Sequence, residues 1–160
     1  MLYRNWLIGG GGGIFLTSAG GGAGTRLVDD GGALWVTPAR LPDGSGYVYT
    51  QDDTLNEYVL SGGQSTTLAQ FYNEYVFNPS VSPDGQYVVF ERQTTGTPIQ
   101  HDLWILNRGR PAEMWALTQD GRSSNPDWSL QEPGTGYRIY VPYANRRHRG
   151  QTTQTLTDLR

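Results

Sequence analysis

Neighbouring carboxylates are the residues of this sequence whose types and spacing could do chemistry. Two Asp-Asp pairs occur, Asp29-Asp30 and Asp52-Asp53, and Glu74 and Asp120 stand in similar polar stretches. Paired carboxylates can hydrolyse glycosidic bonds, one as the acid and the other as base or nucleophile. They can also ligate calcium, although the sequence has no complete loop of the EF-hand type. Because adjacent aspartates in turns are usually solvated, we expect no catalytic residue and no metal site among them.

Other reactive residue types are scarce. The sequence has no cysteine. It also has no lysine, and all twelve basic residues are arginines. Thiolate chemistry, Schiff bases and the phosphate-binding lysine of a P-loop are therefore excluded within it. His101 and His148 are the only histidines, which makes a multi-histidine metal site improbable.

The glycine and serine motifs fail on their spacing. The run Leu7–Ile14 leads an apolar stretch into five glycines, but a dinucleotide fingerprint that starts at Gly9 needs a glycine where Ile14 stands. Ser45 lies between two glycines without the Gly-x-Ser-x-Gly elbow of a serine hydrolase. The sequence therefore predicts no cofactor.

Charge and hydropathy exclude two classes of partner. The net charge is −3 and the single basic cluster is Arg146-Arg-His-Arg149, so we expect no nucleic-acid partner. No apolar run approaches the ~18 residues of a membrane-spanning helix. Arg4 precedes an apolar stretch, as in a secretory signal, but the glycines dilute that stretch. We expect a native-domain or truncated start instead.

Short strands are the elements that must position these residues. Alternating or apolar runs separated by turn clusters recur along the chain, and helical periodicity is nearly absent. Ten tyrosines, five tryptophans and four phenylalanines suit a strand-rich core. The predicted strands are Ile14–Thr17, Arg26–Val28, Leu34–Thr37, Tyr47–Gln51, Glu57–Leu60, Thr66–Ala69, Tyr75–Phe77, Tyr87–Arg92, Asp102–Asn107, Met114–Thr118 and Tyr137–Val141.

An internal repeat determines how these strands are arranged. Pro38–Tyr49 and Pro79–Phe90 share a leading proline, a Pro-Asp-Gly turn and a β-prone run, and Pro126–Tyr140 is a looser third copy. A period of ~40–45 residues indicates four-stranded propeller blades. Proline presets φ in such a turn and glycine tolerates positive φ, so we expect Asp43 and Asp84 to be turn residues rather than catalytic ones.

Four motifs carry a family resemblance: Pro79-Ser-Val-Ser-Pro-Asp-Gly85 with its Tyr-Val-Val-Phe run, Asp102-Leu-Trp-Ile-Leu-Asn107, Leu117-Thr118 and Asn125-Pro-Asp-Trp-Ser129. Together they resemble the WD-like repeat of TolB-type β-propellers. The first unit has Leu41 where the family favours serine, and the third lacks Pro-Asp-Gly. The resemblance implies that each Pro-led strand lines the channel. It also favours a periplasmic or extracellular location.

We therefore predict an all-β propeller of four-stranded blades with about three blade-equivalents over residues 14–142. A glycine-rich segment, 1–13, precedes them, and a polar Arg-rich segment, 143–160, follows as a candidate for part of a further strand. Two whole blades are expected at 33–69 and 74–118, with two strands of a neighbouring blade on each side. TolB-like propellers usually have six blades, so we expect the ring to be completed by the rest of a longer chain or by a second copy, as a homo-oligomer.

The predicted binding face lies opposite the Pro-Asp-Gly turns. Its loops vary in length and carry polar residues, and recognition tends to lie on such loops of a rigid scaffold. The candidate partner-binding residues are Asp29, Asp30, Asp52, Asp53, Tyr72, Glu74, His101, Asp120, Arg122, Arg146 and Arg147. The tryptophans at positions 35, 104, 115 and 128 are expected to pack between blades, with sugar stacking as the alternative.

These features predict a non-catalytic module that binds a protein or a peptide through its loop-rich face. The alternative is an accessory propeller, belonging either to a prolyl-oligopeptidase-type peptidase or to a glycan-binding or glycoside-acting protein.

Overall fold

Strands are the only regular elements in the described part of the chain. The computed structural model describes residues 2–5, 12–129, 137–141 and 152–156. The strands are β1 (Leu2–Asn5), β2 (Gly13–Leu16), β3 (Thr25–Asp29), β4 (Val36–Arg40), β5 (Gly46–Gln51), β6 (Thr54–Val59), β7 (Gln64–Gln70), β8 (Glu74–Val81), β9 (Tyr87–Thr94), β10 (His101–Asn107), β11 (Met114–Ala116), β12 (Asp127–Ser129), β13 (Tyr137–Val141) and β14 (Thr152–Leu156). Within these ranges no helix is present that could cross a membrane. The predicted all-β class is confirmed.

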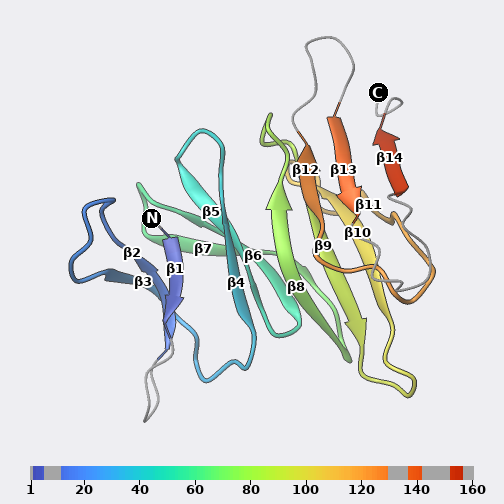
Figure 1. The fold of residues 1–160 in the computed structure, drawn as a ribbon. Coiled ribbons are helices and arrows are strands. Elements are labelled where there is room, and N and C mark those ends of the chain that lie inside the picture. Colours follow the sequence, from blue (N-terminus) through green and yellow to red (C-terminus); the bar gives the residue numbers. More distant parts are fainter. Residues whose placement is uncertain (1, 6–11, 130–136, 142–151, 157–160) are drawn as a thin grey trace.

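The strands form four antiparallel sheets in chain order (Figure 1). Sheet 1 contains β1–β3, sheet 2 contains β4–β7, sheet 3 contains β8–β11 and sheet 4 contains β12–β14. β1 packs against β4 as β5 packs against β8, so β1 takes the second-strand position of its sheet. Sheet 1 thus holds one strand more than the sequence predicted. In sheet 4, β14 lies in the C-terminal segment that was a candidate for part of a further strand, and both four-stranded sheets are as expected.

The second strand of each central sheet contains a continuous buried run. Residues 46–50 of β5 and 88–91 of β9 are all buried. Both runs are rich in β-branched and aromatic residues without a polar alternation, which is the pattern of a strand covered on both faces. The apolar runs of the repeat therefore fold as central strands packed between neighbouring sheets.

The Pro-Asp-Gly turns close the β4–β5 and β8–β9 hairpins through their aspartates. Asp84 Oδ1 accepts the Gln86 N–H at 2.9 Å and the Ser82 hydroxyl at 2.6 Å, and Gly85 has a φ of 73°. Asp43 Oδ1 accepts the N–H and the hydroxyl of Ser45 at 2.9 and 2.8 Å. These two hydrogen bonds hold the pKa of Asp43 below its usual value, with a further contribution from the Arg108 charge. Both carboxylates are turn residues, as predicted.

Three apolar clusters lie between successive sheets. Ile14 of sheet 1 packs with Val36, Tyr47 and Tyr58 of sheet 2. The largest cluster joins sheets 2 and 3 through Leu41, Val48, Leu55, Phe71, Val76, Val88, Phe90 and Leu106. A third joins Val89, Leu103 and Ile105 of sheet 3 to Trp128 of sheet 4. The hydrophobic core is therefore a series of inter-sheet layers, as in stacked propeller blades.

Tyr47 offers a stability test of the first layer. Its ring stacks on Tyr58 with centroids 5.0 Å apart, and it is 1% exposed. Its hydroxyl is buried without a hydrogen-bond partner in the described part of the chain, and burial raises its pKa. Since a buried unsatisfied hydroxyl costs roughly 1–3 kcal/mol, Tyr47→Phe should raise the free energy of unfolding by about 1 kcal/mol in urea titrations. Tyr58→Phe is the control, and a loss of stability in Tyr47→Phe would contradict this assignment.

Candidate functional site

The turns and loops divide between the two ends of the sheets. In Figure 1 the β4–β5 and β8–β9 turns lie at the upper ends of their strands, and the β3–β4, β5–β6, β7–β8 and β9–β10 loops lie at the lower ends. The lower end is called the loop-rich face below. It carries Leu34, Trp35, Tyr72 and Ile99, four large apolar residues that are 49–77% exposed. Such exposure of apolar groups on one face is typical of an interaction surface.

An acidic hollow lies on this face between sheets 1 and 2. Its volume is ≈ 330 Å³, and Asp30, Asp52, Asp53, Gln51 and Thr54 contribute to its lining. The fold thus brings together three of the candidate residues from two separate loops. Asp29 stands beside Asp30 but points to Arg26, with which it forms an ion pair at 3.1 Å.

Two of these carboxylates hold the loops in shape. Asp30 is 4% exposed, and its Oδ1 accepts the Gly32 N–H at 3.1 Å. Asp52 has a φ of 49°, and its Oδ1 accepts the N–H groups of Leu34 and Trp35 at 3.0 and 3.1 Å. Within the described residues the Asp53 carboxylate makes only a longer contact, 3.3 Å to the side-chain amide of Gln70. Of the three carboxylates in the hollow, that of Asp53 is therefore the least engaged in hydrogen bonds that hold the loops.

The remaining described candidates lie around sheet 3. Asp120 accepts the Arg122 N–H at 2.9 Å and the Ser123 hydroxyl at 3.0 Å, so it also shapes a loop. Tyr72 is 77% exposed, and Glu74 forms an ion pair with Arg92 at 2.5 Å. No group of three or more histidine, aspartate or glutamate side chains in the described ranges has the geometry to hold a metal ion. Arg146 and Arg147 lie outside the described residues.

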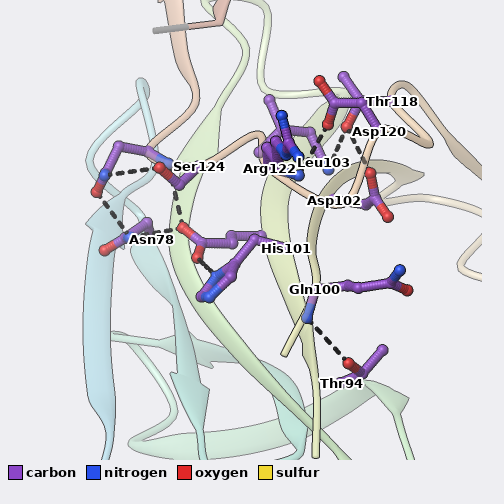
Figure 2. A network of polar contacts seen from close by, with 12 residues as sticks. Asn78, Thr94, Gln100, His101, Asp102, Leu103, Thr118, Asp120, Arg122 and Ser124 are labelled. Carbon is purple, nitrogen blue, oxygen red and sulfur yellow. Dashed lines mark hydrogen bonds and ion pairs between the residues drawn. The ribbon is translucent and has the colours of Figure 1, made fainter. Parts of the chain in front are cut away.

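His101 contacts the buried carboxylate of Glu91 in a partly buried polar network, in which Figure 2 labels His101 and Asn78. Glu91 is 4% exposed, and its Oε1 lies 2.5 Å from His101 Nδ1. Its Oε2 accepts the Asn78 side-chain amide and the Asn125 backbone N–H, both at 3.1 Å. The sequence did not single out Glu91, because it follows an apolar strand run and no pattern marks it as buried.

Residues that precede the leading prolines connect neighbouring sheets at their innermost strands. Asn78 and Asn125 have φ values of 48° and 52°, and the Asn78 amide donates to Asn125 Oδ1 at 2.8 Å. The Asn78 N–H donates to Thr37 Oγ1 at 3.1 Å. Equivalent positions of three repeats thus form a continuous chain of contacts. In the sequence, the two Asn-Pro dipeptides were the feature from which these contacts could have been predicted.

An apolar groove opens beside this chain of contacts. It has a volume of ≈ 470 Å³, with Trp35, Val36 and Pro38 on one side and Phe77 and Asn78 on the other. Thr37, Glu91 and Gln93 complete its lining. The Trp35 and Phe77 rings meet edge to face, 5.6 Å between centroids, and Trp35 is 49% exposed. A groove of this size with apolar walls and a few polar groups has the character of a ligand site.

The four tryptophans do not share one role. Trp104, Trp115 and Trp128 pack against the inter-sheet clusters, which confirms the expectation for them. Trp35 instead stands half exposed at the groove. Trp35 is exposed because of its backbone contacts. Asp52 binds the N–H groups of Leu34 and Trp35 just before β4 begins, and this position leaves the indole outside the core.

Solved structures share this fold at low sequence identity. TolB from Acinetobacter baumannii is 15% identical with a TM-score of 0.63, and the match covers 92% of this chain and 38% of that one. For the putative TolB from Agrobacterium tumefaciens the identity is 18%, the TM-score 0.67 and the coverage 88% and 48%. A prolyl endopeptidase structure matches at 15% identity and a TM-score of 0.53, over 82% of this chain and 21% of that one.

The chain has a TolB-like β-propeller fold, and it spans less than half the length of these structures. The predicted resemblance and the predicted fold class are confirmed. No protein-family profile matches the sequence, and no curated protein matches it.

Proposed function

We propose that this chain is a non-catalytic propeller module that binds a protein or peptide through its loop-rich face. The observation that carries the proposal is the apolar groove beside the Trp35–Phe77 ring pair, which runs along the innermost strands β4 and β8 to Trp35 of the β3–β4 loop on that face. Burying an exposed indole against a partner is strongly favourable, and tryptophan is enriched among residues that dominate binding energy. The carboxylates nearby are engaged by backbone N–H groups, which supports a structural rather than a catalytic role for them.

Substitution of Trp35 tests this proposal. Peptides selected from a displayed random library should bind the wild-type chain and lose at least tenfold in affinity for Trp35→Ser, because a central aromatic contact contributes about 2 kcal/mol or more. Leu60→Ser is the matched control, since Leu60 is also partly exposed but lies in the β6–β7 turn. Circular dichroism would establish that both variants are folded. Selected peptides that bind both variants equally would contradict a site at the groove.

An accessory role beside a hydrolase domain is the second candidate. The likeness to a prolyl endopeptidase structure favours it, although the match covers 21% of that chain. A glycan as the ligand is a further version of this alternative, because an exposed indole can stack on a sugar. Trp35-dependent binding of an oligosaccharide panel, without any peptide, would support that version. The likeness to TolB structures also leads us to propose a periplasmic or extracellular location.

Ring completion is a separate proposal. The matches cover 38% and 48% of the two TolB structures, so we propose that further blades come from the rest of a longer polypeptide or from a second copy. Light scattering on the isolated 160-residue chain is the measurement. A dimer mass is expected if a second copy closes the ring. A well-folded monomer would exclude that version and leave only completion by a longer polypeptide.

A further inference from the structure

We infer that the groove takes an apolar side chain of a positively charged peptide, with a lysine or arginine beside it facing the Asp52-Asp53 loop. This inference rests on the proposed function and specifies its partner. The apolar groove is what carries it, and the acidic loop decides which class of peptide fits.

The acidic loop is hydrogen-bonded to the backbone on both sides of the groove. Asp52 Oδ1 accepts the N–H of Trp35, which forms one wall. The carbonyl of Asp52 accepts the Val76 N–H at 2.8 Å, next to Phe77 on the other wall. The loop therefore spans from sheet 2 to sheet 3 beside the groove. Its carboxylates line the adjoining hollow, so a long cationic side chain next to an apolar residue seated against Trp35 would have to reach across to Asp53.

The charge at this place is negative and uncompensated in the described part of the chain. Asp29 and Glu74 are neutralised by Arg26 and Arg92. No ion pair is formed by Asp30, Asp52 or Asp53 within the described ranges, and Asp53 is partly exposed. Glu91 also lines the groove, but its carboxylate is already engaged by His101, Asn78 and Asn125, so the unpaired charge is that of the Asp52-Asp53 loop. A cationic residue next to the apolar anchor matches this field, whereas an acidic one would be repelled.

The binding preference of labelled peptides tests the inference. The probes are fluorescein-labelled Gly-Lys-Trp-Lys-Gly, Gly-Gln-Trp-Gln-Gly, Gly-Glu-Trp-Glu-Gly and Gly-Lys-Ser-Lys-Gly, followed by fluorescence anisotropy. At about 50 mM salt the lysine–tryptophan peptide should bind three- to tenfold more tightly than its glutamine counterpart. The preference should shrink at about 500 mM salt, where exposed charges are screened. The glutamate and serine peptides should bind most weakly.

Two charge-removing variants locate the effect. Asp53→Asn should reduce the preference for lysine over glutamine to below about twofold. Asp43→Asn is the matched control, because Asp43 lies in a turn at the opposite end of the sheets, and it should leave the preference unchanged. Trp35→Ser should weaken the three tryptophan peptides together.

The outcomes distinguish a failure of this inference from a failure of the proposed function. Equal affinity for the lysine and glutamine peptides, a preference for glutamate, or no binding of any tryptophan peptide would overturn the inference. Library peptides that depend on Trp35 but carry no basic residue would also overturn it, while leaving the proposed function in place. If neither selected nor designed peptides depend on Trp35, both fail.

Discussion

Gly46→Ala is expected to destabilise the chain by about 3 kcal/mol, at the upper end of what a single added methyl group costs. Gly46 begins β5, where its backbone passes close to β6. A Cβ atom at this position would lie 2.1 Å from the carbonyl oxygen of Tyr58. That oxygen belongs to a strand paired with β5 over its whole length, so it cannot move without disrupting the ladder. The added methyl group must therefore break backbone hydrogen bonds.

Urea unfolding followed by tryptophan fluorescence measures this loss. Gly62→Ala is the control, because Gly62 lies in the neighbouring β6–β7 turn and a Cβ there would meet no atom within 4 Å. That variant should change the free energy of unfolding by less than about 0.5 kcal/mol. A Gly46→Ala chain as stable as Gly62→Ala would show that β5 and β6 are not paired in this register.

Glu91→Ala should cost about 2–4 kcal/mol, because it removes the acceptor from three donors at once. The Asn78 amide, the Asn125 N–H and the His101 ring all meet the Glu91 carboxylate. Leaving partly buried donors without their acceptor is more costly than losing a fully exposed contact, and Glu91 itself is 4% exposed. His101 is partly exposed and can turn to water, which keeps the expected loss below that of a fully buried network.

Gln93→Ala is the matched comparison for Glu91→Ala. It lies two residues further along β9, on the same face of the strand, and should cost less than about 1 kcal/mol. Equal stabilities of the two variants would contradict the central position of Glu91. Isotope-edited spectra of the Asn78 and Asn125 side chains would report directly whether their hydrogen bonds are lost in Glu91→Ala.

The strands were predictable because their residues repeat. Tyr-Val-Val-Phe in β9 and Leu-Trp-Ile-Leu in β10 are β-prone runs bounded by turns, and each folds as predicted. β14 was less accessible, since Thr152–Leu156 alternates weakly and no turn motif introduces it. β1 was missed because the following glycines obscured the apolar pattern of the first residues.

The position of a binding site on the loop-rich face stays a prediction from loop polarity and the order of strands. None of the predicted site residues in the described ranges lines the groove. The individual residues depended on tertiary geometry. Asp30 and Asp52 looked available in the sequence, yet the folded loops use them as acceptors for backbone N–H groups. Trp35 looked like a core residue, yet the Asp52 contact holds it half exposed. No local pattern encodes either result.

The placement of the apolar clusters between sheets, rather than within them, has a consequence for cooperativity. Each sheet contributes one half of a layer, so no sheet can retain its core when its neighbour unfolds. The smallest unit that opens and closes as one is therefore a pair of adjacent sheets. In native-state hydrogen exchange the amides of β5 and β9 should share a single opening free energy, although they belong to different repeats.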